Sequence, residues 1–497
     1  MKVSLDKYSS KTKFNFDTLA FCQGKNGQEL VKQLDKKFGS IISEFIKINS
    51  FDFELGTTLV IPLSKQNKVS TAFKSVKRII LVGLGSQDAE TKDLRKAYAA
   101  LIRSAKSNKT EKLAFWQPQD SALAAETSVL INYQFTKYKK PSSKKKIELK
   151  EVKLFDSSTS TSLKKAVKKS VIVAESTCIA RDLVWEPACE VTPSYLAAEA
   201  KKIKAKNLRV SIKEAADCKK LGMGAFLAVA RGSDQPPKFI EFTYKPTGKV
   251  KKHIALVGKG VTFDSGGLSL KPPKAMEMMK EDMAGSAAII GIMNAIAQLQ
   301  PPGVQITAII AATENMPSGK AYRPGDVITA MNGKTIEVNN TDAEGRLTLA
   351  DAVAYASTKN PDEIIDFATL TGACVVALGN VCAAIMSNDE RLTQDLKDSA
   401  SQTGELVWQL PLYDEYKESL KSSIADLINA GSKGKAGSQN GALFIREFIG
   451  NKKGSKEQIP WAHFDIAGPC WFDQNMDWSP KGASGIPVRT ILQYLLG

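Results

Sequence analysis

Two carboxylates and an arginine stand close together in the segment 340–347, at Asp342, Glu344 and Arg346. A β-branched run precedes them and a helical pattern follows, which predicts a strand-to-helix junction. Such junctions lie at the carboxyl end of the sheet in α/β folds, where ligands bind. Thr341 and Glu344 also fit a capping box, which would make the segment a simple helix start but would leave Asp342 and Arg346 without a role.

Four more charged residues interrupt apolar stretches upstream, at Lys259, Asp264, Lys271 and Asp282. Lys259 falls within the run 252–264, which has the composition of a buried central strand. A buried ammonium is costly unless it is paired or neutralised. Two interpretations therefore stay open: Lys259 forms an ion pair with Asp264 or Asp282, or it is a neutral amine that binds a metal.

The four acids of these two groups would repel one another if they met at one edge of a sheet. Two divalent cations would remove that repulsion, and bridging carboxylates can hold such a pair about 3.5–4 Å apart around a shared, activated water. Lys271 and Arg346 could then stabilise a developing oxyanion or hold a small anion. With only two histidines in the chain, a three-histidine zinc site is excluded, so oxygen ligands must do most of the holding.

The elements that must position these residues indicate an α/β fold. We expect a smaller N-terminal α/β domain over residues 1–140, with a structural or assembly role, and a Lys/Ser-rich linker over 141–170. We expect a larger C-terminal α/β domain over 171–497, with a central mixed sheet flanked by helices, which carries the site. The pair Gly83-x-Gly85 lacks the third glycine of a dinucleotide site.

Apolar runs and periodicity predict the elements within the larger domain. Strands are expected at 208–212, 225–230, 239–244, 252–264, 306–312 and 363–370. Helices are expected at 171–185 and 276–298, with Asp282 near the start of the second.

The chain carries a net charge of +17, and twelve lysines against three acids fall between residues 137 and 169. This region reads mainly as a solvated linker with its flanks; the alternative is a surface for an anionic partner such as nucleic acid. Its few aromatic residues weaken the nucleic-acid alternative. A polar amino terminus, scattered cysteines and the lack of an apolar run of about 18 residues predict a cytoplasmic protein with no membrane span.

The spacing of the charged residues resembles the signature of a known family. Intervals of five, seven and eleven separate Lys259, Asp264, Lys271 and Asp282, and the segment Asn340–Leu347 follows. This pattern resembles the cytosolic leucyl aminopeptidases, which are two-metal, metal-dependent exopeptidases. The resemblance extends from about residue 171 to the end of the chain and includes the segments 222–224, 314–316, 323–326, 369–373 and 461–468.

The resemblance implies two divalent metal ions, zinc or manganese or even magnesium. One would be bound by Asp264, Asp342 and Glu344, and the second by Lys259, Asp264, Asp282 and Glu344. The implied reaction is release of amino-terminal residues, leucine-like ones preferred, from peptides with a free amino terminus, through attack of the metal-bridging water.

Further roles follow from the same resemblance. Lys271 would polarise the scissile carbonyl, and Arg346 would hold a bicarbonate that acts as general base. The substrate pocket would be formed by Met279, Asn340, Thr369, Leu370, Gly372, Ala467 and Cys470. The family forms homo-hexamers. Cys470 stands where some relatives have a larger methionine, which leaves the preferred side chain open.

Two alternatives come from other classes. Carboxylate-bridged metals also suit a two-metal phosphoesterase, although the chain has no phosphate-binding loop of the G-x-x-x-x-G-K type. A nucleic-acid-binding role through the basic region 137–169 would be marked by binding that weakens steeply with salt.

Overall fold

The computed structural model describes residues 1–8, 14–25, 29–64, 67, 69–86, 88–140, 147–431 and 434–497. These residues form two compact units. The smaller unit contains residues 1–175 with 474–480, and the larger contains 176–473 with 481–497. Residues 141–146 of the expected linker lie outside the described residues.

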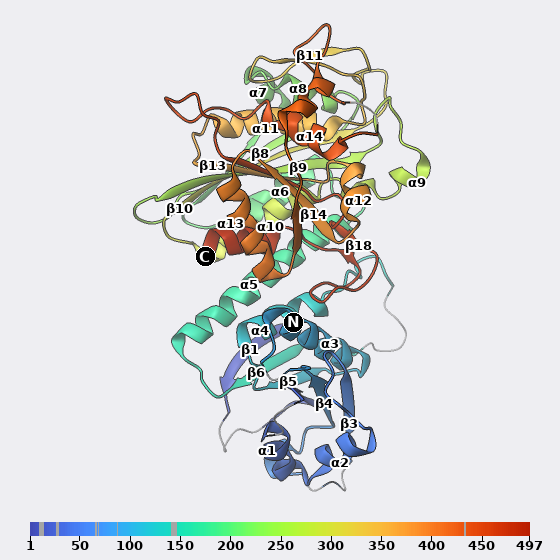
Figure 1. The fold of residues 1–497 in the computed structure, drawn as a ribbon, viewed down its shortest axis with the longest axis vertical. Coiled ribbons are helices and arrows are strands. Elements are labelled where there is room, and N and C mark those ends of the chain that lie inside the picture. The colour runs from blue at the N-terminus through green and yellow to red at the C-terminus, as the bar shows by residue number, and fades with distance from the viewer. Residues whose placement is uncertain are drawn as a thin grey trace. The chain divides into compact units, whose positions relative to one another are not determined.

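The smaller unit is built on a sheet of six described strands in the order β1-β6-β5-β2-β4-β3, with only β3 antiparallel to its neighbour (Figure 1). Its elements are β1 (Lys2–Lys7), β2 (Thr18–Gln23), α1 (Glu29–Phe38), α2 (Ile41–Ile48), β3 (Thr58–Pro62), η1 (Thr71–Phe73), β4 (Arg78–Gly83), α3 (Thr91–Ser107), β5 (Lys112–Trp116), α4 (Ser121–Asn132) and β6 (Glu151–Asp156). Buried apolar side chains line both faces of this sheet. The division between the units falls within helix α5 (Thr161–Trp185).

The larger unit is built on a mixed sheet of eight described strands in the order β15-β14-β17-β13-β9-β10-β8-β7. Its strands are β7 (Leu208–Lys213), β8 (Lys238–Tyr244), β9 (Lys252–Asp264), β10 (Val304–Asn315), β11 (Val327–Thr329), β12 (Thr335–Glu337), β13 (Glu363–Ala368), β14 (Cys382–Ser387), β15 (Leu406–Gln409), β16 (Leu427–Ile428), β17 (Trp461–Asp465), β18 (Trp471–Phe472) and β19 (Gly482–Ala483). Strands β11, β12 and β16 form a separate three-stranded sheet. The predicted α/β fold, with a smaller N-terminal and a larger C-terminal part, is confirmed.

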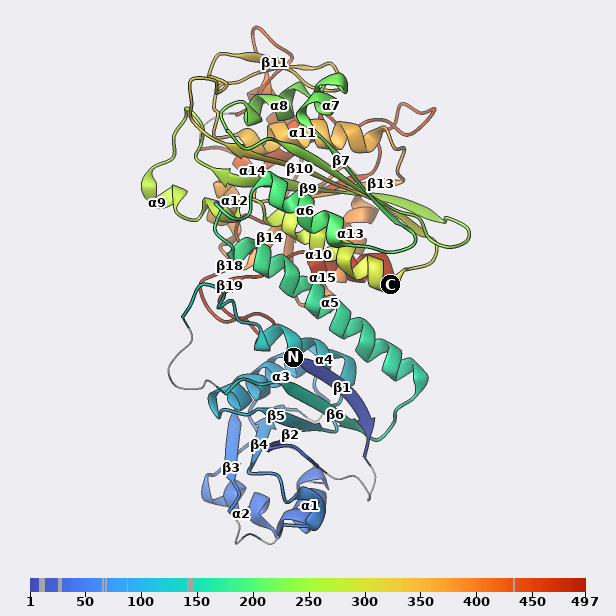
Figure 2. The same ribbon diagram turned by 180° about the vertical axis from the view of Figure 1, so that it is seen from behind.

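Helices cover both faces of the large sheet. The helices of this unit are α6 (Pro193–Lys202), α7 (Ala215–Lys220), α8 (Gly224–Ala230), α9 (Pro273–Met276), η2 (Met279–Glu281), α10 (Ala284–Leu299), α11 (Glu344–Ser357), α12 (Gly372–Leu378), α13 (Glu390–Thr403), η3 (Asp414–Leu420), α14 (Gly437–Arg446) and α15 (Val488–Leu496). Figures 1 and 2 show α8, α11 and α14 over one face and α10, α13 and α15 over the other.

Four neighbouring strands of the large sheet, β17, β13, β9 and β10, run parallel. Parallel strands end at the same edge of a sheet, so the residues that close them lie close together. In the ladder Asn315 of β10 stands opposite Asp264 of β9, and Ala368 of β13 stands opposite Asp465 of β17. This carboxyl edge therefore gathers the polar side chains of Asp264, Asn315 and Asp465 from three segments that are distant in the sequence.

Two of the expected elements are wrong. Residues 225–230, expected as a strand, belong to helix α8; a short apolar run fits a buried strand and a buried helix equally well. The Asp351 carboxylate accepts the Phe226 backbone N–H at 2.8 Å and so helps to stabilise the first turn of α8.

The single helix expected over 276–298 is interrupted. It consists of α9, η2 and α10, and Asp282 follows η2 instead of lying inside a helix. By length and composition the range Pro273–Leu299 could cross a membrane, but 83% of its most apolar window is buried inside the structure. Its apolar side chains therefore belong to the core.

The basic region is only partly described. Lys150 pairs with Glu111 at 2.7 Å and Lys153 pairs with Asp6 at 3.0 Å, both between strands or strand ends of the smaller unit. These pairs account for two of its lysines as ordinary surface ion pairs.

Candidate metal centre

Four acids meet beside the carboxyl edge of the large sheet. Asp264 is the last residue of β9, Asp282 follows η2, Asp342 lies in the loop before α11, and Glu344 is the first residue of α11. Asp264, Asp282 and Glu344 are each at most 4% exposed. A helix amino terminus favours a negative charge, which suits Glu344. The structure thus brings together all four predicted acids.

Lys259 lies among these acids. Its Nζ is 2.6 Å from Asp282 Oδ1 and 2.9 Å from Glu344 Oε1, and it donates to the Thr369 carbonyl oxygen at 2.9 Å. Burial acts to lower the pKa of Lys259, but the attraction of Asp282 and Glu344 outweighs burial and raises it. The ion-pair interpretation therefore describes this structure, and ligation by a neutral amine stays a prediction.

Lys271 lies on the other side of the cluster. Its Nζ is 2.9 Å from Asp264 Oδ2 and 2.6 Å from Asp342 Oδ1. One carboxylate oxygen from each of Asp264, Asp342 and Glu344 lies within 4.8 Å of the others. The three predicted ligands of the first metal are therefore close enough to share one ion.

The cluster has more negative charge than its two lysines can balance. Among the described residues, Asp282 Oδ2 and Glu344 Oε2 are buried without a hydrogen-bond partner. Burial, with repulsion from Glu344 and Asp264, raises the pKa of Asp282 well above its ordinary value despite Lys259. Burial likewise raises the pKa values of Asp264 and Asp342. Such orphaned oxygens are costly unless a cation or proton satisfies them.

These residues fit a pair of divalent cations. The donors are carboxylate oxygens and one amine, which suit manganese, magnesium or zinc. The two orphaned oxygens belong to Asp282, a predicted ligand of one metal, and Glu344, a predicted bridge between both. Divalent cations would neutralise the surplus charge that the lysines leave.

The loop before α11 is not a capping box. The residue that caps α11 is Ala343, with no side-chain hydrogen bond. Thr341 Oγ1 instead donates to the Gly266 carbonyl oxygen and accepts the Ser269 N–H at 2.7 Å. The capping-box interpretation is therefore wrong for this structure, and Thr341 joins the loop after β9 to the loop before α11.

Gly345 makes room for Lys259. A Cβ added at Gly345 would lie 2.5 Å from Lys259 Cε and 2.7 Å from its Nζ. Any side chain at this position would force the end of the Lys259 side chain to move. The glycine between Glu344 and Arg346 is therefore required by the close approach of a neighbouring side chain.

Arg346 is buried beside the cluster. Its Nη1 donates to the Asn429 carbonyl oxygen at 2.9 Å, while its Nε has no hydrogen-bond partner among the described residues. Burial lowers the pKa of Arg346 to about 10, although Glu344 and Asp465 act to raise it. The guanidinium thus keeps one donor that a small anion could use.

The structure links several of the predicted pocket residues. Thr369 Oγ1 donates to Asp282 Oδ1 at 2.8 Å. The Leu370 and Ala467 backbone N–H groups both donate to Asp465 Oδ1 at 3.2 Å, and Cys470 Sγ donates to the Ala467 carbonyl oxygen at 3.4 Å.

The other three predicted pocket residues lie in three different segments. Met279 opens the 3₁₀ turn that precedes Asp282. Asn340 Oδ1 accepts the Asp342 N–H at 2.9 Å. The space that a Cβ on Gly372 would occupy is open.

Two residues that orient the cluster were not predicted. Asn315 donates to Asp264 Oδ1 at 2.8 Å and to the Thr341 carbonyl oxygen at 3.0 Å. Asp465 accepts the Thr371 hydroxyl at 2.6 Å and the Leu370 N–H, and so holds the loop that contacts Lys259. Each is a polar residue that ends an apolar strand, which is the one sequence signal that could have identified them.

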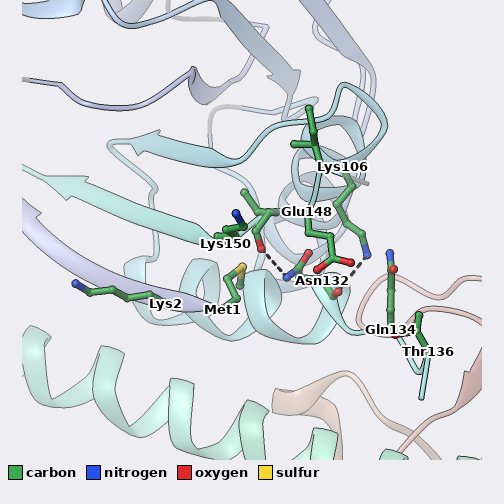
Figure 3. Close-up of a pocket in the computed structure, with 10 residues that line it drawn as sticks. Met1, Lys2, Lys106, Asn132, Gln134, Thr136, Glu148 and Lys150 are labelled. Atoms are coloured by element: carbon green, nitrogen blue, oxygen red, sulfur yellow. Dashed lines mark hydrogen bonds between the residues drawn. The ribbon is translucent and has the colours of Figure 1, made fainter. Parts of the chain in front are cut away.

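A hollow in the smaller unit offers no comparable chemistry. It has a volume of about 430 Å³ and is lined by Met1, Lys2, Lys106, Asn132, Gln134, Thr136 and residues 147–150 (Figure 3). Lys106 Nζ donates to the carbonyl oxygens of Ile131 and Asn132 at the end of α4, and Asn132 Nδ2 donates to the Leu149 carbonyl oxygen. These polar groups serve to join α3, α4 and the start of β6.

Sequence comparison places the chain beside a known family. Residues 178–492 match the catalytic domain of the cytosol aminopeptidase family, and residues 19–142 match its N-terminal domain. A "Probable cytosol aminopeptidase" of Prochlorococcus marinus is 46% identical over 85% of this chain and 86% of its own length. One of Microcystis aeruginosa is 42% identical over 97% of this chain and 96% of its own.

Solved structures show the same similarity in three dimensions. A mutant of tomato leucine aminopeptidase superposes with a TM-score of 0.87 at 35% identity, over 100% of this chain and 96% of that one. The bottromycin maturation enzyme BotP in complex with Mn superposes with a TM-score of 0.83 at 32% identity, over 96% of this chain and 98% of that one.

Proposed function

The chain belongs to the cytosol aminopeptidase family and is a metal-dependent exopeptidase that releases amino-terminal residues from peptides, and we propose that the carboxylate cluster is its active site. The observation that carries this proposal is the surplus of buried acid: four acids stand against two lysines, and among the described residues Asp282 Oδ2 and Glu344 Oε2 have no hydrogen-bond partner. The comparisons do not favour the phosphoesterase alternative.

We assign the ligands as the resemblance implies. Asp264, Asp342 and Glu344 would hold one ion, and Lys259 and Asp282, with Asp264 and Glu344 as bridges, would hold the other. Support comes from the 4.8 Å grouping of the first three and from the contacts of Lys259 with Asp282 and Glu344. Manganese is our first choice, because the donors are mostly oxygen and a similar enzyme is bound to Mn; zinc and magnesium are the other candidates.

The bound metals would supply a nucleophilic water at neutral pH and a Lewis acid beside the scissile carbonyl. The chain's own groups do the rest. Lys271 is held at the cluster by Asp264 and Asp342, so its ammonium is placed to stabilise the negative charge that develops on the carbonyl oxygen. Arg346 would hold a bicarbonate as general base, since no histidine lies among the cluster residues and its buried Nε has no hydrogen-bond partner among the described residues.

The proposed metals also account for a free amino terminus as the recognised group. The lone pair of a neutral α-amine would bind one of the divalent cations, whereas the nitrogen of an acylated amide has no basic lone pair to offer. The apolar and small pocket residues Met279, Ala467 and Cys470 suit a leucine-like first side chain. Cys470 is smaller than the methionine that some relatives have at this position, and so leaves room for substrate side chains longer than leucine.

The test is hydrolysis of leucine p-nitroanilide by the full chain, before and after chelation and after manganese is restored. We expect activity that chelator abolishes and Mn²⁺ restores, and no cleavage of N-acetyl-leucine p-nitroanilide. Equal cleavage of the acetylated substrate would contradict recognition of the free amine. Activity on p-nitrophenyl phosphate without peptidase activity would contradict the assignment as a whole.

We further propose a cytoplasmic homo-hexamer. The names of the relatives support the location. Support for assembly comes from β15, an edge strand on which Leu406 and Trp408 are 52% and 64% exposed, since apolar side chains on an open edge commonly lie in interfaces. Light scattering after size-exclusion chromatography would measure the mass, and a monomer would contradict the hexamer.

A further inference from the structure

A loop with Asp342 joins β12 to α11, whose first turn carries Glu344 and Arg346. β12 pairs antiparallel with β11 at three positions and in parallel with β16 at only two, Ile336 with Leu427 and Glu337 with Ile428. One further backbone hydrogen bond runs from Asn429 N–H to the Glu337 carbonyl oxygen at 3.0 Å. Backbone pairing of these strands stops there, just before the residues of the cluster.

Side-chain amides take over where the backbone pairing stops. Asn339 Nδ2 donates to the Ala430 carbonyl oxygen at 2.8 Å, and Asn339 Oδ1 accepts the Ala430 N–H at 3.1 Å. Asn429 does the same in the other direction: its Oδ1 accepts the N–H of Asn340 at 3.3 Å, and its Nδ2 donates to the Asn340 carbonyl oxygen at 2.6 Å. Each amide therefore forms the two hydrogen bonds that the backbone of the next residue pair in the sheet would otherwise form.

Asn429 makes more contacts than this exchange requires. Its Oδ1 also accepts the Asn339 N–H at 2.9 Å, and its Nδ2 also donates to the Ala343 carbonyl oxygen at 3.4 Å. Both donors of the amide and both lone pairs of its oxygen are thus engaged. Asn429 is 0% exposed, and a fully satisfied buried amide fixes its partners in one arrangement.

The main chain of Asn429 also contacts the first turn of α11. Its carbonyl oxygen accepts Arg346 Nη1 at 2.9 Å. One residue therefore contacts Asn339, Asn340 and Ala343 before the helix and Arg346 in its first turn. Asp342 and Glu344 lie between these contacts.

From this arrangement we propose that Asn429 is a positioning residue: it fixes the backbone that presents Asp342 and Glu344 to the metals and the guanidinium of Arg346 beside them. The inference rests on the proposed function of the cluster. Among the described residues, Asn429 forms no hydrogen bond with the carboxylates of the cluster, so it acts through the residues it holds. Mutation of residues that orient metal ligands costs about 10- to 100-fold in metal affinity or activity.

The chain contains a matched control. Asn388 also bridges backbone groups with its amide, donating to the Ile459 carbonyl oxygen at 3.1 Å and accepting the Trp461 N–H at 2.7 Å. It follows β14, next to the amino end of β17, whereas the cluster lies at the carboxyl edge. Asn388→Ala therefore removes two side-chain hydrogen bonds to the backbone, against four in Asn429→Ala, from the same unit without touching the metal centre.

The experiment measures Mn²⁺ binding to the metal-stripped full chain by calorimetry, together with kcat and KM for leucine p-nitroanilide. We expect Asn429→Ala to weaken the Kd for Mn²⁺ and lower kcat by about 10- to 100-fold each, with a smaller change in KM. Asn388→Ala should leave all three within twofold. Asn429→Asp, which replaces the donating nitrogen by a carboxylate oxygen facing the carbonyl oxygens of Asn340 and Ala343, should lower Mn²⁺ affinity and kcat at least as much as Asn429→Ala.

Several outcomes would overturn the inference. If Asn429→Ala and Asn388→Ala lower the unfolding temperature alike and both leave the Mn²⁺ Kd and kcat unchanged, Asn429 is only structural. If Asn429→Ala does not fold, an unchanged Kd and kcat in Asn429→Asp would have the same meaning. Failure of the unaltered protein to bind Mn²⁺ would instead contradict the proposed metal centre, and this inference with it.

Discussion

Two groups of charged side chains in the larger unit differ in whether their carboxylate oxygens have partners. In the Glu241 cluster, formed by Lys213, Glu241, Tyr355 and Lys359, one carboxylate on β8 receives three partners. Lys213 Nζ lies 2.5 Å and Tyr355 Oη 2.8 Å from Glu241 Oε2, and Lys359 Nζ lies 3.3 Å from Oε1. The carboxylate cluster beside β9 has four acids against two lysines and, within the part of the chain that the structure describes, leaves two oxygens without hydrogen-bond partners.

The difference indicates that the Glu241 cluster contributes to stability and the carboxylate cluster to function. In the Glu241 cluster both oxygens of the acid are satisfied, and the two ammonium groups also lie 4.9 and 4.4 Å from the Tyr355 ring centroid. Such a cluster can hold strands and helices together without a ligand. The carboxylate cluster, among the described residues, leaves two buried oxygens that a cation or a proton has to satisfy. Matched substitutions in the two clusters should therefore have opposite consequences.

The largest effect is expected from Glu344→Gln, which removes a bridging carboxylate and keeps the size of the side chain. Loss of several kcal/mol of transition-state stabilisation should lower kcat/KM for leucine p-nitroanilide by about 10³-fold or more. The stability of the metal-free protein should fall by no more than about 1 kcal/mol, because the change also removes a surplus charge. Activity within tenfold of the unaltered protein would contradict a bridging role.

The next effect is expected from Gly345→Ala. The added methyl group would overlap Lys259 Cε and Nζ, so the lysine must move and overpacking should cost about 1–3 kcal/mol of stability. We expect kcat to fall by about 10- to 100-fold, as misplacement of a ligand by an ångström predicts.

Gly319→Ala is the control for that substitution, because nothing lies within 4 Å of the position its Cβ would take. Thermal unfolding and kcat should stay close to those of the unaltered protein. The role assigned to Gly345 is wrong if the two variants behave alike.

The smallest effect on catalysis is expected from Glu241→Gln, which should leave kcat/KM within twofold. Burial acts to raise the pKa of Glu241, but the hydrogen bonds from Lys213 and Tyr355 outweigh it and lower the pKa below 4.5. A lowered folded pKa contributes stability that is present above about pH 4.5 and is lost as pH falls through the folded value.

Denaturant unfolding of Glu241→Gln as a function of pH tests the direction of this pKa shift. At pH 7 the variant should be less stable by about 1–2 kcal/mol, and the difference should shrink below about pH 4.5. A difference that grows as the pH falls would show that folding raises the pKa of Glu241 instead of lowering it.

Long apolar runs made the central strands predictable. The run over 252–264 and the strand at 363–370 are real, as β9 and β13, because buried parallel strands are apolar on both faces. The short run 225–230 could not be assigned, because its helix is completed by a hydrogen bond from Phe226 to Asp351, a residue 125 positions away. Local patterns carry no information on such partners.

The prediction of the site residues from the sequence has the same limit. Acids and lysines that interrupt apolar runs stand out in the sequence because burial makes them costly, so the residues of the cluster were predictable. Asn315 and Asn429 were not, since an asparagine near a strand end is common in turns. Their roles depend on which loops the fold brings beside them, such as the contact of Asn429 with the Asn340 backbone.

The most direct test of the account is anomalous diffraction at the manganese edge from crystals soaked in Mn²⁺. Two dications per chain should bind within the group formed by Lys259, Asp264, Asp282, Asp342 and Glu344, and no manganese should bind at the Glu241 cluster. An empty site, with its acids sharing protons or turned toward solvent, would contradict the claim that paired dications make this concentration of buried acid stable.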